Sequence, residues 1–99
     1  MLIDIRIYQC KPGMREAFFE MYKTYGWAPQ TRILGEPYSF VKSIEDPNEF
    51  ILMWRYKDLA DREAKRKLMW DDPEWQEYVT HSKAQGAIVS QYNKLVETV

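Results

Sequence analysis

The sequence is poor in the residues that carry most metal, redox and nucleophile chemistry. Among its 99 residues are one cysteine, Cys10, and one histidine, His81. A single cysteine excludes an internal disulfide, and no cluster of Cys and His supplies the ligands of a zinc site. The chain also lacks a glycine-rich phosphate loop and a serine nucleophile elbow. We therefore expect no metal and no other cofactor.

Neither an excess of one charge nor a long apolar run is present. Lys and Arg total 14 against 15 Asp and Glu, which leaves no electrostatic footprint for nucleic acid. No segment has the roughly 18 consecutive apolar residues of a membrane helix, and the first residues do not resemble a secretion signal. We expect a soluble, cytoplasmic protein that binds neither nucleic acid nor a membrane.

Aromatic residues, by contrast, are abundant. They make up 15% of the chain, including four tryptophans and seven tyrosines. A chain of this length predicts one domain, residues 1–99, whose core is too small to absorb so much aromatic surface. Because aromatic side chains are enriched at the centres of protein interfaces, the surplus indicates an oligomer.

The first half of the chain predicts three strands and a helix. Residues Leu2 to Tyr8 alternate between isoleucines and polar residues, as in a half-buried strand. Apolar residues recur at helical spacing from Met14 to Tyr25, whereas Trp27 to Glu36 shows no period and is expected to be irregular. Strands at Tyr38 to Ile44 and Phe50 to Tyr56 form a predicted hairpin, and the second is almost continuously apolar.

The second half predicts two helical segments and a last strand. Asp58 is placed to cap a helix over residues 59–70. Asp72 and Pro73 have the residue types of an N-cap and a first helical position. A final alternating strand is predicted from Ala87 to Val96. The buried stripe of the first of these helices is expected to be Ala60, Ala64 and Leu68.

This order of elements is the βαββαβ pattern of the α+β, ferredoxin-like fold, with a four-stranded antiparallel sheet and helices on one face. We expect Asp4, Arg6 and Tyr8 to lie on the other face, which a monomer leaves open. The third strand is apolar on both sides, so part of it must meet something other than this chain's helices. Pairing with the sheet of a second, identical subunit is the simplest solution.

Two stretches of the sequence resemble the NIPSNAP family. "NEFILMWRYKDLADREAKRKLMWDDPEWQEYV", Asn48 to Val79, is similar to the family's apolar strand with Trp-x-Tyr, its Ala-x-Arg helix and its Asp-Pro-x-Trp segment. "YQCKPGMREAF", Tyr8 to Phe18, is similar to its opening strand and Lys-Pro-Gly turn. The chain departs from the pattern at Glu36-Pro37, where an aromatic residue is expected.

The resemblance implies a dimeric α/β barrel, in which the sheets of two subunits close face to face with their helices outside. That superfamily contains cofactor-free monooxygenases, haem-degrading enzymes, isomerases and dehalogenases, whose pockets usually lie between a sheet and its own helices. The NIPSNAP branch has no agreed reaction, and a fold alone does not fix the chemistry.

Tyr8, Arg55 and His81 are the candidates for catalysis. His81 is the only histidine and could act as a general base or a haem ligand, or be a partly exposed histidine near a helix C-terminus. Arg55 lies in an apolar strand. It either pairs with Asp4 or another acid across a dimer, or clamps a carboxylate or enolate with Tyr8 or Tyr56.

A ligand pocket is predicted from one arginine and several aromatic residues, although their spacing is equally typical of a plain core. These residues are Arg6, Phe18, Tyr22, Trp54, Tyr56 and Trp75. The basic run Arg62 to Lys67 is interpreted as a solvated helix face, because acids stand at i,i+4 to its cations.

Two classes of function remain. The first is a small cofactor-independent enzyme, similar to a monooxygenase or isomerase, or a ligand-binding protein, for a hydrophobic or aromatic carbonyl compound. The second is a non-catalytic homodimeric interaction module. A pocket with a tyrosine or arginine head group and apolar walls favours the first class, and a solidly packed subunit favours the second.

Overall fold

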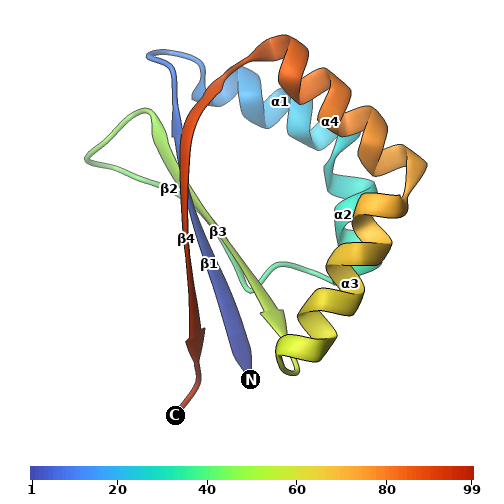
Figure 1. Cartoon of the computed structure of the whole chain (residues 1–99). Coiled ribbons are helices and arrows are strands. Elements are labelled where there is room, and N and C mark those ends of the chain that lie inside the picture. Colours follow the sequence, from blue (N-terminus) through green and yellow to red (C-terminus); the bar gives the residue numbers. More distant parts are fainter.

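The computed structural model describes all 99 residues and has the expected ferredoxin-like fold (Figure 1). Four antiparallel strands form one sheet in the order β2-β3-β1-β4, and every helix lies on the same face of it (Figure 1). The elements are β1 (Leu2–Cys10), α1 (Arg15–Tyr25), α2 (Trp27–Leu34), β2 (Ser39–Lys42), β3 (Glu49–Tyr56), α3 (Leu59–Asp71), α4 (Pro73–Gln85) and β4 (Ile88–Glu97).

The prediction of which side of β1 faces the helices is wrong. Asp4 is completely buried and forms an ion pair with Arg62 of α3, so the polar side of the strand points toward the helices. Ile5 and Ile7 therefore lie on the open face, since neighbouring residues of a strand point to opposite sides. Alternation distinguishes the two faces of β1 but does not decide which face is buried. The polar face is the buried one here because two arginines pair with Asp4.

The core lies between the sheet and the helices. The helix-facing side of β3 supplies Phe50, Leu52, Trp54 and Tyr56, all buried. Phe18 of α1 stacks on Phe50 with ring centroids 5.1 Å apart. The other side of β3, which carries Ile51 and Met53, is only partly buried. An apolar central strand with one uncovered side is what the sequence predicted for a single subunit.

The segment expected to be irregular forms a helix, α2. It is eight residues long, too short for a period to stand out in the sequence. Gly26 lies between α1 and α2. A side chain does not fit at this position, because a Cβ atom there would come within 2.6 Å of the Tyr22 ring and 2.7 Å of the Tyr78 ring. Contacts in the folded chain, including a hydrogen bond from the Tyr22 hydroxyl to Gln30, hold α2 in place.

The predicted caps of the last two helices are confirmed, but the buried stripe of α3 is not. Asp58 accepts a hydrogen bond from the Asp61 amide at 2.8 Å, and Asp72 accepts from those of Glu74 and Trp75. Leu68, expected inside, is 64% exposed, and Ala60 and Ala64 are exposed too. The inner side of α3 carries Arg62, Arg66 and Met69 instead.

The first and last residues of the chain lie side by side at one end of the sheet, where β1 begins and β4 ends (Figure 1). The Thr98 amide donates to the Met1 carbonyl at 2.9 Å, and the Met1 ammonium donates to the Thr98 hydroxyl at 3.2 Å. No helix of the chain combines the length and the apolar character needed to cross a bilayer.

One buried carboxylate connects the sheet to α3. Asp4 Oδ2 accepts from Arg6 Nη1 at 3.1 Å and from Arg62 Nε at 3.0 Å. The two arginine side chains are only 12% and 18% exposed. We expect Asp4→Asn to destabilise the protein by about 3–5 kcal/mol, because it removes the one anion that compensates two buried cations.

Urea unfolding of Asp4→Asn, followed by circular dichroism, measures this loss. Asp71→Asn is the matched control, because its partner Lys67 is exposed and an exposed ion pair adds little to the free energy of unfolding. Equal unfolding midpoints for the two variants would contradict the assignment of Asp4.

Candidate functional site

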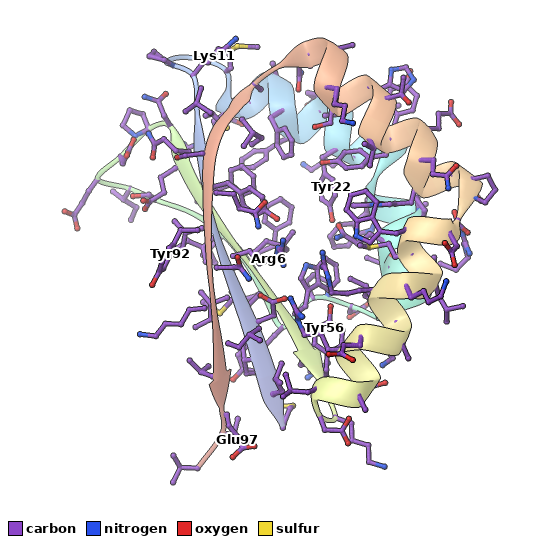
Figure 2. The ribbon with its side chains drawn as sticks, in the orientation of Figure 1. Arg6, Lys11, Tyr22, Tyr56, Tyr92 and Glu97 are labelled. Atoms are coloured by element: carbon purple, nitrogen blue, oxygen red, sulfur yellow. The ribbon has the colours of Figure 1, made fainter.

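A cavity of about 260 Å³ lies between the helix-facing side of the sheet and helices α1, α3 and α4. Arg6 of β1 lies on its sheet side and Tyr22 of α1 on its helix side (Figure 2). Tyr8 of β1 also lines the cavity. Met69 and Trp75 come from α3 and α4. Most of the residues around the cavity are hydrophobic, so it has apolar walls and a few polar groups, as small-molecule sites usually do.

Aromatic rings build these walls. Tyr8 stacks on Phe50 with ring centroids 4.7 Å apart and planes 9° from parallel. Trp75 and Tyr78 of α4 lie 4.5 Å apart. Burial raises the pKa of the Tyr22 and Tyr78 hydroxyls far above the ordinary range, so both stay protonated at neutral pH.

The polar groups on the sheet side form a chain that ends at Tyr8. Asp4 accepts a hydrogen bond from Arg6 Nη1, and Arg6 Nε donates to the Tyr8 hydroxyl oxygen at 3.1 Å. Burial alone would lower the pKa of Arg6, but Tyr8 and Asp4 together raise it, so Arg6 is a permanent cation. Because the Tyr8 oxygen already accepts, its own O–H is left to donate to another acceptor.

Arg66 projects into the same cavity from α3. The Tyr56 hydroxyl lies near the Arg66 guanidinium. That hydroxyl has no partner at hydrogen-bond distance. Burial raises the pKa of Tyr56, and the charge of Arg66 opposes that rise. Arg66 thus places a second guanidinium, besides that of Arg6, at the cavity wall.

The structure brings some of the predicted site residues together and separates others. Five of them line the cavity, namely Arg6, Tyr8, Phe18, Tyr22 and Trp75. Trp54 and Tyr56 lie on the same face of the sheet, in the core beside the cavity. Arg55 is exposed on the opposite face, away from Tyr8.

His81 also lies outside the cavity lining. Its ring stacks on Tyr25 with centroids 3.7 Å apart, and its Nε2 stands 3.9 Å from Glu77. The predicted trio of Tyr8, Arg55 and His81 therefore does not form one site, and Tyr8 is its one member at the cavity. Arg55 also does not pair with Asp4, whose partners are the arginines already described.

Cys10 is buried, and burial raises the pKa of its thiol, which disfavours the nucleophilic thiolate. No group of three or more His, Cys, Asp or Glu side chains is arranged to hold a metal ion. The polar side chains that do line the cavity include hydrogen-bond donors and cations.

Arg66, Tyr78 and Gln30 also line the cavity, although the sequence does not mark them as site residues. Arg66 belongs to the basic run that was interpreted as solvated, and that interpretation is wrong for Arg62 and Arg66, which face inward. Their i,i+4 spacing places them on one side of α3, and Met69 follows three residues later. The spacing of Arg62, Arg66 and Met69 indicates a common helix face. The acids at i,i+4 to the neighbouring cations favour the opposite interpretation, a solvated face.

Solved structures of similar fold include several proteins of one family. A NIPSNAP family protein of unknown function from Agrobacterium tumefaciens is 28% identical, with a TM-score of 0.89 over 100% of this chain and 88% of its own. A NIPSNAP-like domain protein from Burkholderia xenovorans is 30% identical, with a TM-score of 0.88 over 99% of this chain and 84% of its own.

A more distant structure, an antibiotic biosynthesis monooxygenase, is 17% identical and has a TM-score of 0.68 over 100% of this chain and 99% of its own, which shows a shared fold. No curated protein matches the chain in sequence. The NIPSNAP family model matches residues 3–99, nearly the full length. The Lys-Pro-Gly, Trp-Arg-Tyr and Asp-Pro-Glu-Trp motifs, the fold and this match together establish that the chain belongs to the NIPSNAP family.

Proposed function

We propose that the protein is a small cofactor-independent enzyme that binds an aromatic or apolar carbonyl compound in the cavity between its sheet and helices. The observation that carries this proposal is the chain Asp4–Arg6–Tyr8, which ends with a free O–H at a cavity with apolar walls. A cavity with a polar head group and aromatic walls is the arrangement expected of a small-molecule site.

Tyr8 is the residue that would act on the substrate. Its hydroxyl donates a hydrogen bond to the carbonyl oxygen, and that bond strengthens as negative charge develops there on the way to an enolate. The proton of the neighbouring carbon passes to a solvent base, because no Asp, Glu or His lines the cavity. Arg6 contributes a fixed positive charge behind the tyrosine oxygen, and Asp4 keeps Arg6 in position. Enolate stabilisation of this kind is useful to both an isomerase and a cofactor-free oxygenase.

Tyr8→Phe tests this role, because phenylalanine keeps the ring that stacks on Phe50 and removes only the hydroxyl. The assay follows hydrogen–deuterium exchange by NMR at the carbon beside the carbonyl of aryl ketones and keto acids. We expect the wild-type protein to accelerate exchange and Tyr8→Phe to lose roughly 100-fold of that acceleration, as on removal of one oxyanion donor.

Tyr38→Phe is the matched control, because this tyrosine is 50% exposed and does not line the cavity. It should exchange at the wild-type rate. Exchange by Tyr8→Phe at the wild-type rate would remove Tyr8 from the mechanism.

We propose also that the open face of the sheet pairs with a second copy of the chain. Ile5, Ile7, Ile51 and Met53 form a partly exposed apolar centre on this face, and β4 adds Tyr92 at 62% exposure (Figure 2). A bare apolar sheet face of this kind is covered most simply by an identical face in a twofold dimer. Such a dimer leaves both cavities on its outer, helix-covered sides.

Ile51→Lys should dissociate this dimer, because it would bury an unpaired ammonium at the centre of the interface. Light scattering after size exclusion, at micromolar protein concentration, should give the mass of a dimer for wild type and of a monomer for the variant. Ile44→Lys, in the hairpin turn and 99% exposed, should remain dimeric. A monomeric wild-type protein would contradict the proposal.

A non-catalytic interaction module is the second candidate. It is favoured by the outer side of α3, where Leu59 and Leu68 are 55% and 64% exposed on a helix whose inner side carries arginines. Absence of any exchange activity or ligand binding, with the dimer intact, would favour this candidate.

A further inference from the structure

We infer that the ligand of the cavity carries a carboxylate and that Arg66 is the residue that binds it. This inference rests on the proposed function and names its substrate class, an aromatic keto acid. It follows from the charges around the cavity, from the missing partner of Arg66 and from the positions of the hydrogen-bond donors.

The charges around the cavity are of one sign. Arg6, Arg66 and Lys83 line it, and no Asp or Glu does. Asp4 Oδ2 binds both Arg6 and Arg62. The single negative charge of Asp4 is therefore already matched by two cations. A chain with balanced overall charge thus has a cationic cavity, which attracts anions.

Arg66 has no anionic partner. No carboxylate lies within 4.0 Å of it, whereas Arg6 and Arg62 on either side of the cluster both bind Asp4. Its side chain is half-buried and lines a largely aromatic cavity, rather than extending into solvent as most surface arginines do. A carboxylate is the group that matches the planar guanidinium with two parallel hydrogen bonds.

The other donors define the remainder of the ligand. The free O–H of Tyr8 lies on the sheet side and Arg66 comes from α3, so the cavity offers two separate sites for ligand oxygen atoms. Trp75 and Tyr78 provide an aromatic wall, and the Trp75 indole N–H is buried without a partner. A keto acid with an aromatic body supplies the carbonyl oxygen, the carboxylate and the ring that these groups require.

A carboxylate fits this cavity better than a phosphate. Arg66 is the guanidinium there that has no carboxylate partner, and Lys83, which also lines the cavity, is exposed. Sites for phosphate groups commonly add a glycine-rich loop or several backbone amides, and this chain has no such loop. A single negative charge on a flat group is what Arg66 can match.

The experiment compares acids with their neutral methyl esters. The probes are phenylpyruvate, 4-hydroxyphenylpyruvate and indole-3-pyruvate, each with its methyl ester, titrated into the wild-type protein by isothermal calorimetry and saturation-transfer NMR. Each pair differs by one negative charge and shares the same ring and ketone. We expect the acids to bind roughly 10- to 100-fold more tightly than the esters, as for loss of one charge-assisted contact.

Arg66→Gln should remove that preference by weakening the acids roughly 10- to 100-fold while leaving the esters unchanged. Arg66→Lys keeps the charge and should restore part of the affinity for the acids. Lys67→Gln is the matched control, because it removes a cation from the next residue, which is exposed and paired with Asp71. Thermal unfolding of each variant verifies that it is folded.

The outcomes separate this inference from the function on which it rests. Esters that bind as tightly as acids, or an Arg66→Gln variant with undiminished affinity for the acids, would overturn the carboxylate assignment and leave the carbonyl site standing. If none of the six probes binds at millimolar concentration, both the site and its substrate class are wrong.

Discussion

The buried carboxylate of Asp4 is the interaction on which the interior of this protein depends. It holds Arg6 on the sheet and draws Arg62 of α3 toward β1. Both contacts use Oδ2, and Oδ1 has no partner. Burying these charges costs free energy. The cluster is tolerated because each cation is paired with Asp4. Its structural effect is to fix α3 above the sheet and to aim Arg6 at Tyr8.

The same cluster borders the cavity through Arg6, which lines it and binds Asp4. Aromatic residues of α1, α4 and β3 form much of the remaining wall, with Phe18, Phe50 and Tyr8 stacked in sequence. The polar cluster and the aromatic core therefore meet at the cavity.

The fold, the helix caps and the order of the elements other than α2 could be predicted from the sequence, because they depend on local signals. Asp58 and Asp72 act within one helical turn, and the alternation of β1 is visible in seven residues. The orientation of β1 and α3 could not be predicted, because the rule that polar residues face water fails when distant residues neutralise one another. Asp4 and Arg62 are 58 residues apart, and neither position alone indicates that they meet. The place of Arg66 at the cavity could not be predicted for the same reason, because it depends on the orientation of α3.

The two sides of β1 carry two different traits of the protein. Arg6 and Tyr8 face the cavity, while Ile5 and Ile7 face the open side of the sheet. Neighbouring codons in one short stretch of the gene therefore shape different surfaces, which under the proposed function would select the small molecule and the partner subunit. Because alternate positions point in opposite directions, one surface can change without altering the other. A single strand can in this way serve two independent lines of selection.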